Sequence, residues 1–160
     1  LMLHHFHKRL CFLCYLINAY DYSLKKQIRR HKKIYFNDVA MAAKIGFRHS
    51  DDYGRILENI VFIELRRRNK EIYFHQKIKE CDFIIKEDNK ITCAYQVTSS
   101  LECNKTKARE YNGLLEAMQQ YNLCQGYILT DDFTDEEVIE KDNRNYKIII
   151  KPIWEWLLEE

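Results

Sequence analysis

The feature that most constrains the fold is a change in the spacing of apolar residues near residue 70. Before it, residues 52–69 repeat apolar side chains at helical spacing, with Ser50 and Asp51 as N-cap candidates. After it, three stretches alternate with the period of two that strands require, at 71–76, 81–86 and 91–98. A polar turn, 87–90, joins the last two. We therefore expect a helix followed by three strands, of which the last two form a hairpin.

The second half of the chain predicts a helix between strands. Residues 105–121 have a helical apolar stripe, strands are expected at 126–130 and 146–151, and Pro152 starts a short helix. A helix between two neighbouring strands acts as a crossover, so 91–98 and 126–130 should pair in parallel through a right-handed connection. This order predicts an α/β fold in which helices flank a mixed sheet, and 160 residues suffice for one such domain.

The first 50 residues give weaker signals. Residues 10–17 and 20–24 are aromatic-rich and predict a small hairpin. The basic run 25–33 is expected to be a solvated connector. Residues 33–37 predict a short strand, after which Asp38 caps a helix.

Charge and cysteine content exclude some classes of protein. There are 26 Lys and Arg against 24 Asp and Glu, and the net charge of +2 gives no global argument for binding nucleic acid. The six cysteines form no framework, which fits a reducing cytoplasm better than a disulfide scaffold. The longest apolar stretch, 10–17, is shorter than the roughly 20 residues that a membrane helix needs. We therefore expect a cytoplasmic protein without a membrane partner.

Two N-terminal groups have residue types that bind metals. Cys11 and Cys14 are not followed by a second pair at zinc-finger spacing. The histidines have no Cys or carboxylate partner at ligand spacing, which favours a surface cluster over a metal site; they are His4, His5 and His7.

An acidic residue lies within the apolar stripe of the first strong helix. Glu58 shares helical spacing with Val61, Phe62 and Leu65, so its carboxylate should face the sheet. A carboxylate in such a place must be hydrogen-bonded, paired or metal-bound. A buried Glu held by a backbone amide or an Arg is the plain structural alternative.

The strand hairpin brings further polar residues toward Glu58. If Glu87 pairs with Ile91 across a three-residue loop, Asp82 lies opposite Gln96. Gln96 and Thr98 are two residues apart and so point to the same face. We therefore expect these side chains to converge on one spot.

This ordered set resembles the PD-(D/E)xK nuclease superfamily, which has an acidic residue on a helix, an Asp on a strand and Glu-x-Lys on the next strand. More closely, the chain is similar to the uncharacterised nuclease-like domain at the C-terminus of many prokaryotic AAA-type ATPases. The resemblance covers residues 20–158. Its matching stretches are KKIYFND (32–38), GRILENIVFIELRRR (54–68), ECDFII (80–85), YQVTSS (95–100), TKAREYNGLL (106–115), GYILTDD (126–132) and IIIKPIWEWLL (148–158).

The resemblance implies a restriction-endonuclease-like domain over residues 31–160, with residues 1–30 as the tail of a winged-helix-like segment. It also implies an upstream ATPase domain as a partner, since this chain has no GxxxxGK[ST] motif of its own. The first residue is Leu, and residues 1–30 lack a clear helical period, which suggests a start inside a longer protein. The apolar segment 10–24 is a candidate homodimer surface.

Two positions depart from the nuclease pattern. A metal nuclease of this type has Glu at 96 and Lys at 98, where the acids bind a divalent cation and the Lys orients the attacking water. Here Gln96 keeps an oxygen ligand without the charge, and Thr98 supplies no cation. Glu58, Asp82 and Gln96 remain as ligands for weakly held Mg²⁺ or Mn²⁺. A lysine supplied from elsewhere stays open, with Lys77, Lys79 and Lys105 as candidates.

The degenerate catalytic set Glu58, Asp82, Gln96 and Thr98 leaves three functions open. The first is a non-catalytic or vestigial nuclease-fold domain, which serves an AAA-type ATPase as a recognition or assembly module and binds nucleic acid or protein. The second is a metal-dependent nuclease that acts on DNA or RNA with a relocated lysine. The third is a purely structural interaction domain.

Basic residues outside this set are candidates for contacting nucleic acid. Arg66 and Arg67 end the strong helix, where cations also complement the helix dipole, and Glu64 with Arg68 would form an i,i+4 pair. Lys77 and Lys79 would extend such a patch. Arg109 is expected either to reach the Asp82 region as an ion pair or stand-in cation, or to pair with Glu110 on the helix surface. The resulting candidate set is Arg66, Arg67, Lys77, Lys79 and Arg109.

Overall fold

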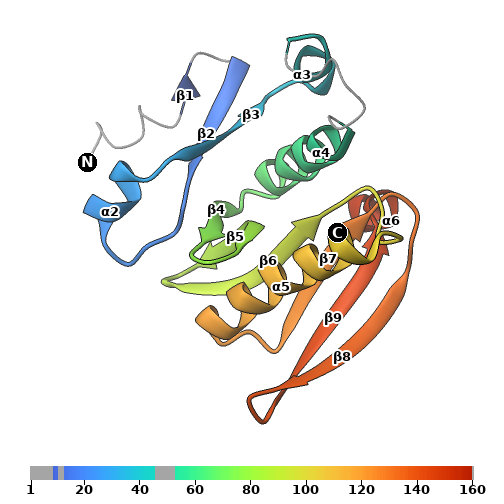
Figure 1. Cartoon of the computed structure of the whole chain (residues 1–160). Coiled ribbons are helices and arrows are strands. Elements are labelled where there is room, and N and C mark those ends of the chain that lie inside the picture. The colour runs from blue at the N-terminus through green and yellow to red at the C-terminus, as the bar shows by residue number, and fades with distance from the viewer. Residues whose placement is uncertain (1–8, 11–12, 46–52, 160) are drawn as a thin grey trace.

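The computed structural model describes residues 9–10, 13–45 and 53–159 (Figure 1). The predicted caps Ser50 and Asp51 lie outside these residues, as do Cys11 and the three N-terminal histidines. The elements are β1 (Arg9–Leu10), β2 (Cys14–Asn18), α2 (Leu24–Arg29), β3 (Lys32–Phe36), α3 (Val39–Ile45), α4 (Tyr53–Arg67), β4 (Glu71–Gln76), β5 (Glu80–Glu87), β6 (Lys90–Val97), α5 (Asn104–Tyr121), β7 (Gln125–Thr130), β8 (Asp135–Lys141), β9 (Arg144–Pro152) and α6 (Ile153–Leu158).

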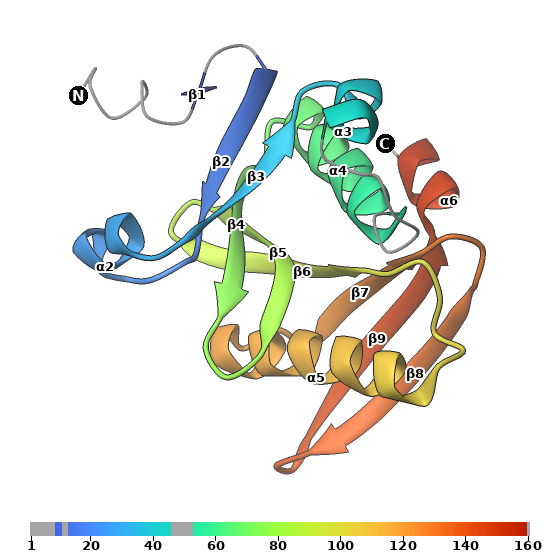
Figure 2. The ribbon, with the colours of Figure 1, turned by 45° about the horizontal axis from the view of Figure 1, so that its top comes forward.

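The main sheet has six strands in the order β4-β5-β6-β7-β9-β8. Its first three strands are antiparallel neighbours, β7 lies parallel to both β6 and β9, and β8 pairs antiparallel with β9. The helix α5 covers one face of this sheet, and α4 and α6 cover the other (Figures 1 and 2). The predicted mixed α/β sheet flanked by helices is therefore confirmed, including the parallel pair on either side of the crossover helix.

Each face of the sheet has its own apolar core. On one face, α5 packs Leu114 and Met118 against Ile128 and Ile148 of the parallel strands. On the other, the α4 stripe predicted from its spacing packs against strand residues and Trp156 of α6, because its side chains lie one helical turn apart. The predicted apolar residues Val61, Phe62 and Leu65 are each 1% exposed or less, and the structure adds Leu57, which is 5% exposed.

A second, three-stranded sheet lies beside α4, in the order β1-β2-β3. The predicted hairpin of 10–17 with 20–24 is wrong, because β2 pairs with β3 instead and residues 24–29 form the helix α2. The basic run is thus partly helical rather than a connector. Ile17 and Ala19 are buried in the same core as the α4 stripe, so much of the apolar N-terminal segment is covered by this chain itself.

Two predictions for residues 33–38 are confirmed, and one strand of the main sheet, β8, was not predicted. The short strand predicted at 33–37 is β3, and the Asp38 carboxylate accepts the backbone amide of Ala40 at 2.7 Å at the start of α3. The strand β8 was not predicted because five of its seven residues are charged, and its two apolar residues, Val138 and Ile139, are adjacent rather than two apart. In the part of the chain that the structure describes, no helix combines the length and the apolarity needed to span a bilayer.

Candidate functional site

The β5–β6 hairpin sets the position of Asp82. The register pairs Phe83 with Tyr95, so Asp82 stands at the level of Gln96 as predicted. The turn is one residue shorter than expected, with Glu87 opposite Lys90, and a β-bulge after Ile85 restores the predicted alignment.

Asp82 is held by the backbone where the two strands separate. Its Oδ2 accepts the Val97 amide at 3.0 Å, and the carboxylate is buried. Its other oxygen, Oδ1, points toward the second sheet, where it contacts a cation that was not predicted from the sequence.

That cation is the ammonium group of Lys33, on β3. Lys33 Nζ lies 2.8 Å from Asp82 Oδ1, 3.0 Å from Glu58 Oε1 and 2.9 Å from Glu80 Oε1. Tyr35, two residues along the same strand, donates its hydroxyl to Glu58. The second sheet, α4 and β5 together thus build a lysine-centred acidic pocket, which we define as Lys33, Tyr35, Glu58, Glu80 and Asp82.

Burial and mutual charge perturb the groups of the acidic pocket. Burial and the charge of Asp82 raise the pKa of Glu58 to about 7, although Lys33 and the Tyr35 hydroxyl oppose this. Burial alone would lower the pKa of Lys33, but Asp82, Glu58 and Glu80 outweigh it and raise the pKa above its usual value. Burial and the Glu58 charge raise the pKa of Tyr35 as well. Lys33 therefore remains an ammonium while the pocket keeps an excess of negative charge.

Gln96 and Thr98 form different contacts from those the nuclease pattern requires. Gln96 Oε1 accepts the backbone amide of Asp82 at 3.2 Å, while its Nε2 donates to Glu110 Oε2 on α5. The hydroxyl of Thr98 donates to the carbonyl of Ser100 at 3.1 Å. The structure thus brings together Glu58 and Asp82, but it directs Gln96 toward α5 rather than toward Glu58.

The approach of α5 to the hairpin depends on a glycine. A Cβ at Gly113 would lie 2.1 Å from the backbone oxygen of Glu80, a distance that no side chain tolerates. One turn earlier, Glu110 is 2% exposed, and burial raises its pKa. Arg109 Nε binds Glu110 at 2.9 Å, which is one of the two predicted outcomes, although Glu110 is buried rather than on the helix surface.

The other basic candidates do not form one patch. Arg67 and Arg68 both bind Glu64, at 2.7 and 2.6 Å, which confirms the predicted helical pair, and Arg66 lies over the ring of Tyr15. Lys77 and Lys79 follow β4, whereas the arginines precede it. A strand of that length separates the two groups by roughly 20 Å.

No lysine predicted as a substitute contacts the carboxylates. Lys77 donates to Gln120, and Lys79 and Lys105 are exposed. Lys33 was missed because it precedes Asp82 by 49 residues and belongs to another sheet. The available signal was weak: Lys33 and Tyr35 are polar groups two apart on a predicted strand, so they share a face.

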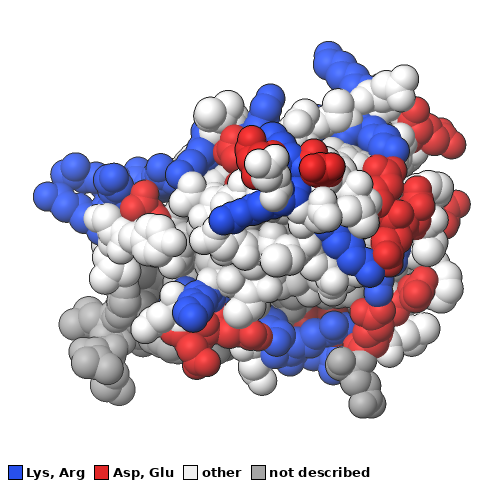
Figure 3. All heavy atoms as spheres, turned by 90° about the horizontal axis from the view of Figure 1, so that it is seen from below, with Lys and Arg blue, Asp and Glu red and all other residues white. Residues whose placement is uncertain are grey.

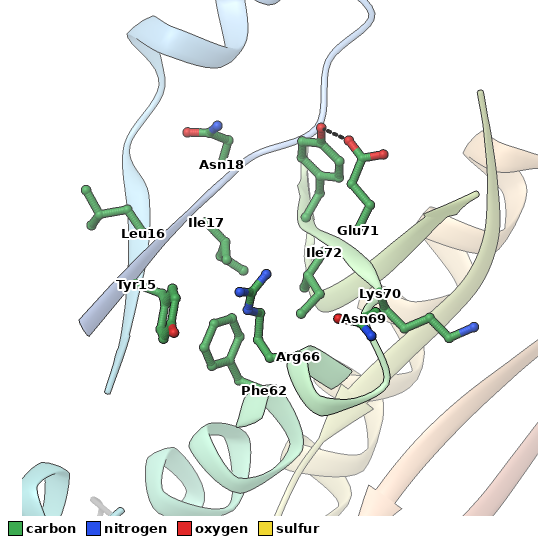
Figure 4. Close-up of a pocket in the computed structure, with 11 residues that line it drawn as sticks. Tyr15, Leu16, Ile17, Asn18, Phe62, Arg66, Asn69, Lys70, Glu71 and Ile72 are labelled. Atoms are coloured by element: carbon green, nitrogen blue, oxygen red, sulfur yellow. Dashed lines mark hydrogen bonds between the residues drawn. The ribbon is translucent and has the colours of Figure 1, made fainter. Parts of the chain in front are cut away.

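The described residues hold no group of three or more His, Cys, Asp or Glu side chains arranged to bind a metal. A pocket of about 340 Å³ lies elsewhere, between β2, the end of α4 and β4, and does not include the carboxylates (Figure 4). Its lining is Tyr15, Leu16, Ile17, Asn18, Phe62, Arg66, Asn69, Lys70, Glu71, Ile72 and Tyr73.

Comparison with known proteins finds a relative of similar sequence. The chain is 31% identical over 156 residues to the uncharacterized protein MJ1544 of Methanocaldococcus jannaschii. The match covers 92% of this chain but 33% of the relative, so the chain spans about a third of that protein's length. No protein-family model matches the chain.

Proposed function

We propose that this chain is a nuclease-fold domain without hydrolytic activity, which serves a prokaryotic AAA-type ATPase as a recognition or assembly module. The observation that supports this most is the position of the Lys33 ammonium, within 3.0 Å of an oxygen of three different carboxylates. A divalent cation bound by Glu58 and Asp82 would need the same place. Metal binding would therefore require Lys33 to leave three ion pairs, two of which, to Glu58 and Asp82, are charge-assisted hydrogen bonds.

The contacts of Gln96 support the same proposal. Both ends of its side-chain amide are occupied, by the Asp82 backbone and by Glu110. As a neutral ligand it would add little to the affinity for Mg²⁺, which prefers carboxylates and keeps several waters. The proposal thus assigns the pocket a structural role and assigns recognition to the surface.

The ATPase context rests on the sequence resemblance and on the length of the relative. The homologous region occupies a third of MJ1544, so in that protein it belongs to a longer chain. The reading frame of the gene upstream of codon 1 tests this point. An in-frame segment with a GxxxxGK[ST] motif is expected, and a stop codon without such a segment would contradict the ATPase context.

The absence of hydrolysis is tested by calorimetry and cleavage assays together. Titration with millimolar Mn²⁺ should give no binding heat that depends on Asp82, and single- and double-stranded DNA and RNA should remain intact. The decisive comparison is Asp82→Asn against Asp132→Asn, an exposed aspartate far along the chain. Metal-dependent cleavage that Asp82→Asn abolishes and Asp132→Asn preserves would overturn the proposal.

The second candidate is a divalent-metal-dependent nuclease that acts on DNA or RNA, with Lys33 as the relocated lysine. Lys33 contacts both retained acids, and burial together with the charge of Asp82 raises the pKa of Glu58. If this candidate holds, Lys33→Met should abolish cleavage while Lys32→Met, on the neighbouring position, should preserve it. Intact substrate with wild-type protein would dismiss it.

A further inference from the structure

The chain carries two oppositely charged segments at opposite ends of the molecule. Residues 24–33 contain six Lys or Arg and no acid, whereas residues 131–140 contain six Asp or Glu and no Lys or Arg. The first segment includes α2, and the second includes all of β8 except its last residue, Lys141. The two elements lie far from one another in both ribbon views (Figures 1 and 2), so they do not neutralise each other within one copy.

The basic end consists of α2 and the β4–β5 turn, which Arg30 links through its hydrogen bond to the carbonyl of Gln76 at 3.1 Å. Its exposed cations are Lys25, Lys26, Arg29, Lys77 and Lys79, none of which has an ion-pair partner among the residues that the structure describes. Figure 3 shows Lys and Arg side chains gathered at the side of the molecule that carries α2.

The basic end also carries exposed apolar side chains. Ile78 is 88% exposed between Lys77 and Lys79, and α2 and the residues before it add further exposed side chains. These are Tyr22, Leu24 and Ile28, each at least 61% exposed. Aliphatic side chains gain nothing from a phosphate backbone, but they gain from contact with a protein surface. The combination therefore favours an acidic protein surface with apolar groups of its own.

The acidic end combines exposed carboxylates with exposed apolar side chains. Within the described chain, Asp132, Asp135 and Glu140 are exposed and form no ion pair, in contrast to Glu136 and Glu137, which bind lysines. Val138 is 62% exposed and Phe133 is 45% exposed among these acids. Because β8 is the last strand of its sheet, its outer side is open to a partner. In Figure 3 acidic side chains gather on the side opposite to α2.

We propose that the basic end of one copy binds the acidic end of the next, so that the chain associates head to tail. Such an interface is heterologous, because different surfaces meet, and it continues into a closed ring or an open filament rather than stopping at a dimer. The inference is independent of the proposed function, since it uses neither the acidic pocket nor an ATPase domain.

Salt and concentration test the association directly. In sedimentation velocity at low ionic strength, the average mass of the wild-type chain should rise with concentration beyond that of a dimer. It should return to that of the monomer at 1 M NaCl, where charges are screened within about 3 Å. A wild-type chain that stays monomeric at low ionic strength and high concentration would overturn the proposal.

Charge reversal at each end identifies the surfaces. Lys25→Glu with Lys26→Glu lowers the charge of residues 24–33 from +6 to +2, and Asp132→Lys with Glu140→Lys changes that of residues 131–140 from −6 to −2. Each double variant alone should associate about tenfold more weakly or worse, because one of its two ends is weakened. An equimolar mixture should associate again, because the unaltered acidic end of one variant meets the unaltered basic end of the other. Circular dichroism establishes that each variant is folded, and all four positions are exposed.

A matched control distinguishes the loss of the basic end from a change in net charge elsewhere on the surface. Lys44→Glu with Lys90→Glu changes the net charge equally, at exposed lysines on α3 and β6, and should associate like the wild type. A mixture that fails to associate would overturn the proposal. So would stronger aggregation of the Asp132→Lys, Glu140→Lys variant alone, because the acids would then protect the β8 edge. Binding of an oligonucleotide by a monomeric wild type, lost with Lys25→Glu and Lys26→Glu, would assign the basic end to nucleic acid and also overturn it.

Discussion

Lys33 balances the charge of the acidic pocket at the scale of single residues. Its side chain is 17% exposed, and the Asp82 side chain is 10% exposed. Removing one partner of a buried ion pair leaves the other without compensation, which costs more than the pair itself contributes. We expect Lys33→Met to lower the free energy of unfolding by about 2–4 kcal/mol at pH 8, measured by urea denaturation.

The neighbouring position provides the control for this prediction. Lys32 has no ion pair among the described residues, so Lys32→Met should change the free energy of unfolding by less than about 0.5 kcal/mol. Equal effects of the two substitutions would show that the pocket does not depend on the Lys33 ammonium.

Glu58 should make stability depend on pH. Its pKa is about 7 in the folded chain, against an ordinary value near 4.3, so the folded state binds its proton more tightly than the unfolded chain does. The free energy of unfolding should therefore fall as the pH rises from about 4.5 to about 7, by about 1–3 kcal/mol from this group. The buried His75, whose pKa burial lowers, acts in the opposite direction near pH 6.

The variant Glu58→Gln isolates this contribution. Its stability, measured by denaturant unfolding at several pH values, should lack the fall between pH 4.5 and 7, while the His75 contribution stays in both proteins. Parallel pH profiles of wild type and variant would mean that Glu58 has an ordinary pKa. The raised pKa of Lys33 contributes only above pH 10, outside this range.

The acidic pocket illustrates what a sequence can predict at the scale of residues. Glu58 was found because a carboxylate interrupts an apolar stripe, and Asp82 because the hairpin alignment is local. Lys33 follows neither rule. Its contact with Asp82 depends on how the second sheet packs against α4, and no period or spacing encodes that packing.

At the scale of elements, Gly113 lets α5 lie directly on the hairpin. Gly113→Ala would place its Cβ 2.1 Å from the Glu80 carbonyl oxygen, so α5 must shift, with a cost of about 3 kcal/mol or more in free energy of unfolding. Gly54→Ala in α4 is the counterpart, since nothing lies within 4 Å of that Cβ. It should stabilise the chain by up to about 1 kcal/mol through helix propensity. Thermal unfolding of both variants checks the contrast, and equal shifts would contradict the close approach.

Element predictions succeeded where the pattern is local and failed where pairing is remote. The Asp82–Gln96 alignment came out right although the predicted turn was one residue too long, because a β-bulge compensates. The strand β2 was given the wrong partner because β3 lies beyond an unrecognised helix. The strand β8 has no apolar alternation to reveal it, because its two apolar residues, Val138 and Ile139, are adjacent in the sequence.

At the scale of the whole molecule, the N-terminal segment completes the core on the α4 side of the sheet. Ile17 and Ala19 are buried there, Ala19 bridges to Phe74 of β4, and β2 supplies the antiparallel partner of β3, which carries Lys33. The boundary after residue 30 that the sequence resemblance implies would therefore divide a paired sheet, a consequence that a truncated chain can measure.

We expect a fragment of residues 31–160 to be less stable than the whole chain by at least about 3 kcal/mol. Losing a buried Ile costs about 1.5–3 kcal/mol, and β3 loses its five-residue pairing with β2 as well. A fragment of residues 13–160 keeps both features and is the control for shortening the chain. Urea denaturation followed by tryptophan fluorescence reports on Trp156, which is buried in the same core. If 31–160 unfolds at the same urea concentration as 13–160, residues 13–30 contribute nothing to this core and the boundary after residue 30 is a true domain boundary.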